Sequence, residues 1–418
     1  MSLFPAIASR AFTLGKALEQ DLPLGHARGL GSILNLNDFQ AAAKRVLPRA
    51  IYGYVENGSE DETSLQSNRE AFLDYRLVTR VLRDVEHRHQ TVSLFGKTFA
   101  APFGIAPMGG SAAVTYDADR RMARAASKAG IPFALSGNSI TPMERVARVC
   151  PGAWFASYQS PNTRAIEGMV SRVADAGFGV FVMTADVPEG SNREKDHRAG
   201  FSQPIRFNRK IVLDGMRRPG WVVSTALRTL LTRGVPHIDN LDYNGGPSLF
   251  SRSVTKIASH ASLSWAHVEL VRKRWKGPLV VKGLLSREDA RIAREAGVDG
   301  IVVSNHGGRQ LNGAAAPIHV LPGIVEEAKG LTVLIDSGFR RGTDVLTALA
   351  MGAHFVLIGR PFLFAAAVGG EAGVRHAIDL LSKEIDRDMA MLGLHRLGEI
   401  GPEMLLNVRG SAAIRAVP

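Results

Sequence analysis

The chain has 418 residues, of which 45% are hydrophobic and 22% are charged, and this balance excludes a disordered protein while allowing a single large domain or a pair of smaller ones. Its single cysteine, Cys150, excludes an intramolecular disulfide and a multi-cysteine metal site, as is typical of a protein in or facing the cytosol. The 51 basic and 39 acidic residues give a net charge of +12, which is compatible with nucleic acid, anionic lipid or an anionic substrate as a partner, and the distribution of the charge has to decide among them.

Residues 1–34 are predicted to form a poorly ordered N-terminal extension, ahead of one domain that spans residues 35–418. Residues 1–18 lack acidic side chains and contain Arg, Ser and Lys, so a transit peptide is the alternative. The continuous apolar core and the cleavage site of a secretory signal are absent from them. No stretch of the chain approaches the roughly 18 consecutive apolar residues that a membrane-spanning helix requires.

Short apolar runs recur along the domain and are predicted to be eight β-strands. They occupy residues 103–108, 133–137, 154–158, 179–186, 279–283, 300–306, 332–338 and 355–360. Because these runs are almost continuously apolar rather than alternating, both faces of each strand are expected to be buried, as in a parallel sheet.

Helical patterns separate the strands, and several begin at a Ser, Asn, Thr or Asp and end just before a Gly, as helix capping prefers. They occupy residues 117–130, 141–150, 162–177, 286–297 and 341–353, and further helices are expected within residues 34–58 and 252–275. A chain in which each strand is followed by a helix or a substitute fits a closed barrel better than an open sheet. The predicted fold class is therefore α/β, a (β/α)8 TIM barrel with N-terminal helices.

A long basic insertion interrupts this spacing after the fourth strand, over residues 190–260. Residues 191–235 contain ten Lys or Arg and three acidic residues, which accounts for +7 of the net charge of +12. Within them, residues 215–234 mix arginines with Trp221, Val and Leu, a composition that favours peripheral contact with a membrane surface. The alternative is a solvated loop whose helix packs on the barrel or on a neighbouring subunit. Nucleic acid is not an expected partner, because the sequence has no platform of aromatic and basic residues.

Polar residues stand at the ends of most of the predicted strands. In a TIM barrel these C-terminal ends form the active-site face. The residues are Tyr158, Thr184, Asp186, Lys282, His306, Arg309, Asp336, Arg340, Gly359 and Arg360. Each alone is explained as well by a solvent-exposed rim or a helix cap, but charged side chains at so many apolar strand ends predict a functional site.

The arginines and glycines near these ends indicate two anionic ligands. An arginine guanidinium binds a carboxylate or a phosphate through two donors, so Arg193 and Arg309 are expected to hold an anionic substrate. The segments after the seventh and eighth strands, with Gly338 and Gly359, lie where barrels commonly bind a phosphate. A phosphate-bearing cofactor and a separate carboxylate substrate are therefore predicted, with a phosphate-binding barrel that performs no redox chemistry as the alternative.

His306 is the predicted general base, because the unperturbed pKa of a histidine lies near physiological pH. Asp186 is expected to orient the imidazole ring and to stabilise its protonated form. The alternative for His306 is a hydrogen-bonded turn residue. A metal site is not expected, because the other candidate ligands are not closely spaced.

Several motifs, taken in order, resemble the FMN-dependent 2-hydroxy-acid dehydrogenase and oxidase family. They include SNHGGRQL at residues 304–311 and LIDSGFRRGTDVLTALAMGAHFVLIGRP at residues 334–361, within a likeness that covers residues 36–406. The DSGFRRG motif and the basic insertion are most similar to the (S)-mandelate and membrane-bound L-lactate dehydrogenases of that family. The resemblance implies FMN as the cofactor and oxidation of a lactate- or mandelate-like L-2-hydroxy acid to the 2-keto acid, with a quinone or another electron acceptor. An oxygen-using oxidase and an FMN-binding barrel with changed or lost activity are the alternatives.

The resemblance also implies roles for the matching residues. Those assigned to the substrate are His306 as the base, Asp186 as its partner, Tyr158 as a hydrogen-bond partner of the hydroxyl, and Tyr54, Arg193 and Arg309 as ligands of the carboxylate. Those assigned to FMN are Pro107, Met108, Gly109, Ser136, Thr184, Lys282, Ser304, Asp336, Gly338, Arg340, Gly359 and Arg360. The family further implies a homotetramer. The single cysteine and the basic segment predict a cytoplasmic protein, peripheral on the inner face of the cell membrane.

Two positions bear on the expected activity. The family usually has Gln two residues before the tyrosine of the third strand, where it contacts the flavin pyrimidine, and this chain has Ala156 there. Loss of the amide is expected to weaken flavin binding or to change the flavin potential. Gly109 matches the small residue that is more usual in the dehydrogenases than in the oxidases, which often have Ala.

Overall fold

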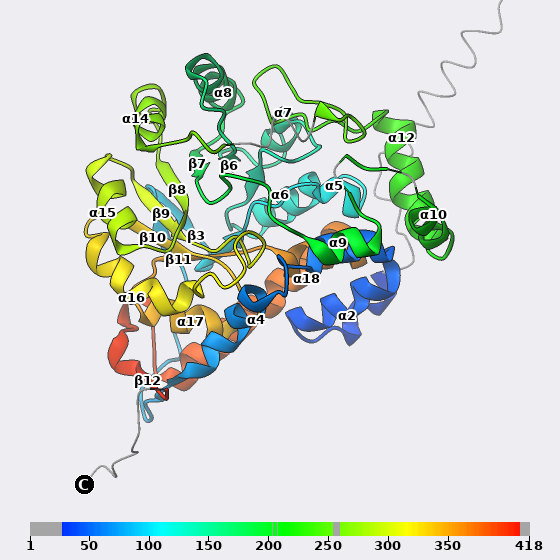
Figure 1. Cartoon of the computed structure of the whole chain (residues 1–418). Helices are drawn as coiled ribbons and strands as arrows, with labels where there is room; N and C mark the ends of the chain where they lie inside the picture. The colour runs from blue at the N-terminus through cyan, green and yellow to red at the C-terminus, as the bar shows by residue number, and fades with distance from the viewer. Residues whose placement is uncertain (1–26, 203, 207, 254–259, 410–418) are drawn as a thin grey trace, which may run out of the picture.

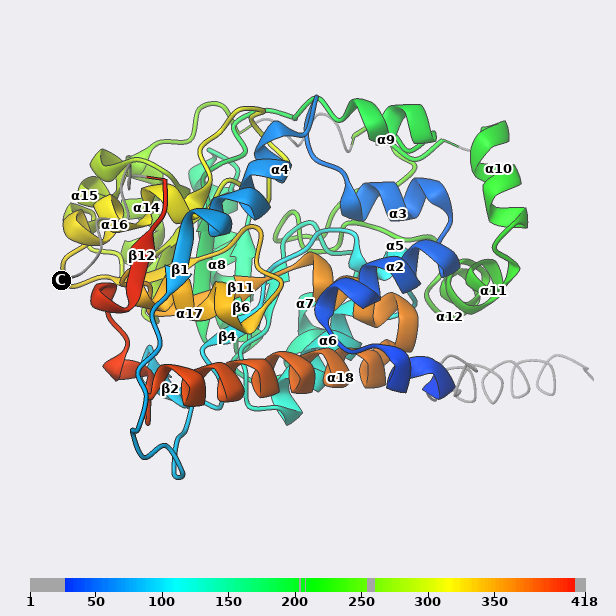
Figure 2. The same ribbon diagram turned by 90° about the horizontal axis from the view of Figure 1, so that it is seen from below.

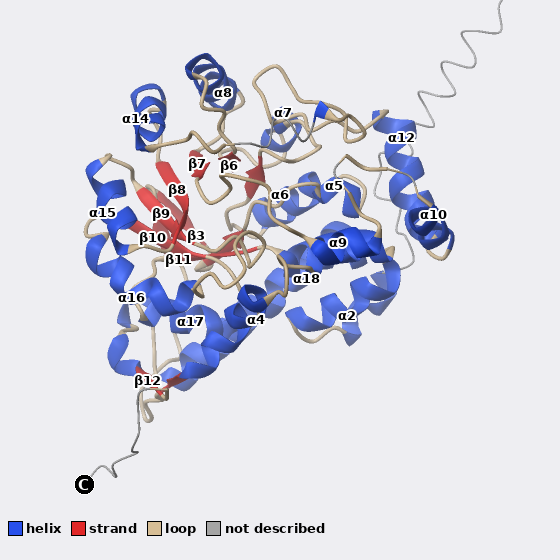
Figure 3. Cartoon of the chain, in the orientation of Figure 1, coloured by secondary structure: helices blue, strands red, loops and turns tan. Residues whose placement is uncertain are grey.

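The computed structural model describes residues 27–202, 204–206, 208–253 and 260–409. Residues 1–26 of the predicted extension lie outside the described residues, as do residues 254–259 of the region where a helix was expected. Parallel strands form a sheet in the middle of the molecule, and helices surround it (Figure 3).

The parallel strands occupy the eight predicted positions. They are β4 (Phe103–Ile105), β5 (Ala134–Ser136), β6 (Trp154–Ser157), β7 (Val180–Thr184), β8 (Leu279–Leu284), β9 (Gly300–Val303), β10 (Thr332–Ile335) and β11 (Phe355–Ile358). Neighbours in sequence are neighbours in the sheet, and β11 returns to pair with β4. A parallel bridge between Ile105 and Phe133 joins β4 to the start of β5 and completes the ring. The predicted (β/α)8 TIM barrel is therefore confirmed.

Aromatic and branched side chains fill the inside of the barrel. Trp154, Val182 and Phe355 are all at most 2% exposed and belong to one interior cluster. A hairpin of β2 (Val92–Leu94) and β3 (Lys97–Phe99) covers the end of the barrel where the strands begin. The ring of Phe95 lies 5.8 Å from that of Trp154, the first residue of β6. The predicted functional residues lie at the opposite end of the barrel, where the strands end.

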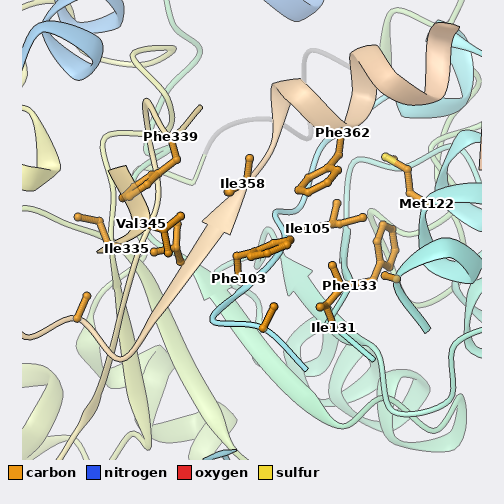
Figure 4. Close-up of a cluster of buried hydrophobic side chains, with 14 of the residues drawn as sticks. Phe103, Ile105, Met122, Ile131, Phe133, Ile335, Phe339, Val345, Ile358 and Phe362 are labelled. Carbon is orange, nitrogen blue, oxygen red and sulfur yellow. The ribbon is translucent and has the colours of Figure 1, made fainter. Parts of the chain in front are cut away.

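The outer faces of the strands pack against the helices. Figure 4 shows Phe103, Ile105 and Ile358 pointing toward the same cluster as Phe133 and Phe362. The rings of Phe103 and Phe362 are stacked at 6.1 Å with an interplanar angle of 14°. Burial on both faces explains why the strands have almost continuous apolar sequences.

The helices around the barrel are α6 (Ala118–Lys128), α7 (Met143–Ala147), α8 (Thr163–Asp175), α14 (Trp265–Arg274), α15 (Arg287–Glu295), α16 (Pro317–Glu327), α17 (Gly342–Ala350) and α18 (Arg360–Leu392). Two of them, α16 and α18, are not among the predicted helices. Pro317 and Pro322 interrupt the pattern of α16, although the first of these occupies a position at the start of the helix that tolerates proline. Gly369 and Gly370 have non-helical dihedral angles and divide α18 into two parts.

Short elements lie before and after the barrel, and α5 (Ser111–Val114) follows its first strand. Those before it are η1 (Ala27–Ser32), α2 (Leu36–Val46), α3 (Arg49–Glu56), α4 (Thr63–Glu70), η2 (Ala71–Asp74) and β1 (Tyr75–Leu77). Those after it are η4 (Leu397–Glu399), η5 (Pro402–Met404) and β12 (Leu405–Asn407), the last paired antiparallel with β1. Helix α2 lies along α18 (Figure 2). Asn35 caps α2 by accepting a hydrogen bond of 2.8 Å from the N–H of Asn37. Ile33, which falls in the predicted extension, is only 6% exposed.

The insertion after β7 is drawn in green in Figure 1, and its helices α10 and α12 stand at the edge of the molecule. It contains α9 (Glu194–Ala199), α10 (Arg209–Met216), α11 (Pro219–Trp221), the π-helical segment η3 (Val222–Leu227) and α12 (Arg228–Arg233). Trp221 does not belong to its outer surface, because the indole N–H donates to the Val114 carbonyl at 2.8 Å. Within the predicted membrane-contact segment, residues 215–234, the exposed large apolar side chains are Met216, Val223, Leu227, Leu230 and Leu231. No helix in the described part of the chain is long and apolar enough to cross a membrane.

Candidate active site

His306 and Asp186 form a pair at the ends of β9 and β7. The Nδ1 atom of His306 lies 3.0 Å from Oδ1 of Asp186. Burial would raise the pKa of Asp186, but its interactions with His306 and Lys282 lower it below its usual range, so the carboxylate is ionised. An ionised carboxylate keeps a proton on Nδ1 and leaves Nε2 of His306 as an acceptor. That Nε2 atom lies 3.5 Å from the hydroxyl oxygen of Tyr158.

The position of Asp186 depends on the glycine at the neighbouring strand end. Gly283 has a φ of +110°, and a Cβ atom built on it would lie 2.4 Å from Cβ of Asp186. His306 itself has a φ of +58°, a conformation that costs energy for a residue with a side chain. The backbone at Gly283 and His306 therefore adopts left-handed conformations that place His306 against Asp186, although at His306 this conformation costs energy.

Lys282 supplies a buried positive charge in the centre of the strand ends. Its ammonium group donates to Oγ of Ser304 at 2.7 Å and lies 2.9 Å from a carboxylate oxygen of Asp336. Burial alone would lower the pKa of Lys282, but Asp336 and Asp186 raise it above its usual value. The lysine is consequently charged although only 4% of the residue is exposed.

Arg309 follows His306 by three residues and reaches α3. Its guanidinium donates to the carbonyl oxygens of Tyr54, at 2.8 Å, and Asn57, at 2.9 Å. Burial and the nearby Arg193 lower the pKa of Arg309 to about 10. The hydroxyl of Tyr54 donates to the Gly109 carbonyl at 2.9 Å. Since Arg309 binds carbonyl oxygens rather than a carboxylate of the chain, its charge is available to an anionic ligand.

Two further arginines lie at the ends of β10 and β11. Arg360 donates to the carbonyl oxygens of Val55 and Gly307, at 2.8 and 2.9 Å. Burial, and then the charges of Arg309 and Arg340, lower the pKa of Arg360 well below its usual value. Burial also lowers the pKa of Arg340, to about 10. Like charges held this close together in a buried place favour a bound polyanion, which would relieve their repulsion.

Two adjoining cavities lie over the strand ends. The inner cavity, of about 120 Å³, and the outer cavity, of about 150 Å³, share the lining residues Tyr54, Gly109, Tyr158, His306 and Arg309. Arg193 lines only the outer cavity. The predicted cofactor ligands that line the inner cavity are Pro107, Met108, Gly109, Lys282, Asp336, Gly338, Arg340, Gly359 and Arg360. A larger cavity of about 710 Å³ lies elsewhere, between α18 and the insertion helix α11.

Three predicted cofactor ligands are buried beside the inner cavity without lining it. Ser136, Thr184 and Ser304 are at most 4% exposed, and Ser304 connects Lys282 to the backbone N–H of His306. Ala156 is 1% exposed and belongs to the interior cluster of the barrel. The space that the family gives to an amide is thus part of the apolar interior here.

His260 is a residue of the site that the sequence patterns did not identify. It lies at the end of the insertion, lines the outer cavity, and its ring centroid is 6.2 Å from that of Tyr158. Its Nδ1 atom is 2.8 Å from the carbonyl of Gln159, and burial lowers the pKa of His260, which indicates a neutral ring. No spacing in the sequence links His260 to Tyr158, which is far from it along the chain.

The residues present fit the phosphate and the flavin of FMN. The arginine cluster at β10 and β11 suits a phosphate, Lys282 provides a buried cation for an electron-rich ring, and the His306–Asp186 pair opens into the adjoining cavity. Among the described residues no group of three or more His, Cys, Asp or Glu is placed to hold a metal ion. Fold and site together define a TIM-barrel oxidoreductase of the flavin mononucleotide class.

The comparison with known proteins gives the family. The profile of the FMN-dependent dehydrogenase family matches residues 43–407. The (S)-mandelate dehydrogenase of Pseudomonas putida is 38% identical over 378 residues, covering 90% of this chain and 94% of the relative. An L-lactate dehydrogenase of Xanthomonas campestris pv. campestris is 37% identical over 384 residues, covering 90% of this chain and 98% of the relative.

A solved structure of the monotopic membrane protein (S)-mandelate dehydrogenase superposes with a TM-score of 0.84 at 36% identity, covering 90% of this chain and 99% of that one. The chain therefore belongs to the FMN-dependent dehydrogenase family, and FMN is its cofactor. The family that the motifs indicated is confirmed, as are the fold class and the expectation of an oxidoreductase.

Proposed function

We propose that this FMN-dependent dehydrogenase oxidises an L-2-hydroxy acid to the corresponding 2-keto acid. The observation that carries the proposal is the opening of the His306–Asp186 pair into the same outer cavity as Arg193 and Arg309. A base and two cations around one small cavity suit a ligand that carries a hydroxyl beside a carboxylate. The relatives named for mandelate and lactate act on acids of this class.

In this proposal each residue of the pair has a distinct task. Asp186 holds the proton on Nδ1, so Nε2 of His306 takes a proton from the substrate, and the carboxylate then stabilises the imidazolium. Tyr158, 3.5 Å from that Nε2, orients the substrate hydroxyl. The same geometry serves removal of the proton from the hydroxyl or from the α-carbon.

The remaining residues bind and orient. Arg193, Arg309 and Tyr54 hold the substrate carboxylate, while Arg340 and Arg360 hold the phosphate of the cofactor. FMN, when bound, accepts two electrons from the substrate. Lys282 contributes a buried positive charge that favours negative charge on the ligand above it.

An anaerobic titration tests the function. The purified protein should be yellow, and lactate, mandelate or another L-2-hydroxy acid should bleach the flavin absorbance. In His306→Gln the rate of bleaching should fall by roughly 10²–10⁴-fold, the usual contribution of a general base. A yellow protein that no 2-hydroxy acid bleaches would favour the alternative of changed or lost activity. The reason for this alternative is Ala156, which is buried at the position where the family usually has Gln. Stoichiometric hydrogen peroxide in air would favour an oxidase.

The acceptor and the location form a second part of the proposal. The insertion contacts a membrane surface, and electrons pass from the flavin to a quinone there. In support, Val223, Leu227, Leu230 and Leu231 are exposed on η3 and α12. The exposed cations of the neighbouring segment are Arg209, Lys210 and Arg217, whereas Arg228 is buried against Tyr116. This surface would lie on the inner face of the cell membrane. Recovery of all activity in a low-salt soluble fraction would contradict the membrane contact, and absence of quinone reduction would contradict the acceptor.

The assembly is proposed to be a homotetramer, as the family resemblance implies. Light scattering of the detergent-solubilised protein should give about four times the chain mass of 45.0 kDa. A mass of one chain would contradict this part without affecting the proposed reaction.

A further inference from the structure

The insertion contributes a second surface, which faces the substrate rather than the outside. Its apolar side chains that line the outer cavity are Phe201, Ile205, Ile238, Leu241 and Leu249. They come from segments that flank α10–α12 in the sequence. The insertion therefore has an outward surface on α10–α12 and an inward wall on the segments around them.

We infer that this inward wall selects the substrate side chain, and that the enzyme prefers 2-hydroxy acids with a bulky apolar side chain, aryl or branched alkyl, over glycolate and lactate. The inference rests on the proposed function. It assigns to the wall a specificity role that is separate from chemistry, because none of its side chains bears a group that can exchange a proton.

The wall is held in place by contacts inside the insertion. The backbone N–H of Ile205 donates to the carbonyl of Leu249 at 3.0 Å, and the N–H of Leu249 donates to the carbonyl of Pro236 at 3.1 Å. Ile238 donates to Pro247 at 3.0 Å. These bonds tie segments on both sides of α10–α12 into one unit, so the wall has a defined shape.

Contacts with the barrel fix the same unit over the strand ends. Ile238 is 5% exposed and packs in a cluster with Ala112, in α5 after β4, and Ile140, in the loop after β5. The ring of Phe201 lies 4.7 Å from the ring of Tyr54, a residue shared by the two cavities. A substrate in the outer cavity therefore contacts a preformed apolar surface.

In this inference the polar residues of the outer cavity bind the carboxylate and the hydroxyl of the substrate, so its side chain contacts the apolar wall. Arg193 and Arg309 serve the carboxylate, and His306 and Tyr158 serve the hydroxyl. No Asp or Glu is among the described residues that line this cavity, so a cationic side chain has no partner. His260 lies beside Tyr158, on the side of the hydroxyl. The part of the substrate that remains faces aliphatic and aromatic carbon.

The volume of the cavity indicates the size of that side chain. An outer cavity of about 150 Å³ holds several water molecules, and the methyl group of lactate would leave part of the apolar wall in contact with water. Each further buried methylene raises kcat/KM about fourfold, the equivalent of about 0.8 kcal/mol. Three additional carbons, as between lactate and 2-hydroxy-4-methylpentanoate, should therefore raise kcat/KM about 60-fold.

The test measures anaerobic flavin reduction with glycolate, lactate, 2-hydroxybutanoate, 2-hydroxy-4-methylpentanoate and mandelate. Calorimetric dissociation constants of the corresponding 2-keto acids give a second readout that does not depend on turnover. We expect both series to improve with side-chain size. Equal or better values for lactate than for the two bulky acids would overturn the inference while leaving the proposed function intact. Failure of all five acids to reduce the flavin would instead refute the proposed function.

Variants of the wall separate its role from the general hydrophobicity of the site. Ile205→Ala and Leu249→Ala should each lower the ratio of kcat/KM for 2-hydroxy-4-methylpentanoate to that for lactate about tenfold. Ile205→Trp fills the cavity and should lower the same ratio. The control is Val212→Ala on α10, whose side chain is 50% exposed and does not line the cavity, so the ratio should not change. A ratio unchanged in all three wall variants, with normal flavin content, would overturn the inference.

Discussion

Replacing Asp186 by Asn tests the central pair with little change in shape. The Asp186 carboxylate lies 3.0 Å from Nδ1 of His306, and at an effective dielectric constant of about 20 its attraction for an imidazolium is about 5 kcal/mol. This sets an upper limit of about 10⁴-fold on the rate, because about 1.4 kcal/mol corresponds to a factor of ten. An Asn amide can also donate to Nδ1, which would place the proton on Nε2 and block the base. We expect kcat to fall about 10²–10⁴-fold.

Stopped-flow measurement of flavin reduction without oxygen is the assay. KM should change less than kcat, because Arg193 and Arg309 still hold the carboxylate. The control, Asp386→Asn, removes a carboxylate that pairs with Arg88 at 2.6 Å on the surface and should leave the rate unchanged. A rate within threefold of the wild type for Asp186→Asn, with full flavin content, would refute the reasoning that this carboxylate positions the base.

Three further predictions concern binding and stability. Arg309→Lys should raise KM for the hydroxy acid about tenfold or more in steady-state assays, because one ammonium cannot replace a planar guanidinium; an unchanged KM would remove Arg309 from the carboxylate site. Gly283→Ala should lower the free energy of unfolding by about 1–3 kcal/mol in chemical denaturation and slow flavin reduction, since its Cβ would collide with Asp186. Asp119 is fully buried, and burial raises its pKa to about 6, so wild-type stability should fall by up to about 3 kcal/mol relative to Asp119→Asn as pH rises from about 4 to about 6. Parallel pH profiles of unfolding for the two proteins would contradict that assignment.

The barrel could be predicted because its signals are local. Each strand is a short apolar run, and burial on both faces makes that run continuous, so β4–β11 were all found at their positions. The exceptions have local causes as well. Two prolines interrupt the helical pattern of α16, and the Gly369–Gly370 pair interrupts that of α18, so neither helix was predicted.

Part of the site could be predicted for the same reason. His306, Lys282 and Arg360 stand at the ends of apolar runs or within three residues of them, and parallel strands in a barrel bring their C-terminal ends to one face. The structure places all three around the inner cavity. Their roles in catalysis and binding stay predictions until the variants are measured.

The sequence by itself thus determined the fold class, the family and the residues at the strand ends, because hydrophobic period and motif spacing are properties of neighbouring residues. Only the tertiary structure decided which parts of the insertion line the outer cavity. The ring of His260 lies beside that of Tyr158, and the ring of Phe201 lies beside that of Tyr54, although long stretches of chain separate the members of each pair. Ile205 and Leu249 are adjacent only because backbone hydrogen bonds join segments on both sides of α10–α12. Such contacts depend on packing between distant segments, and no local pattern of side chains encodes them.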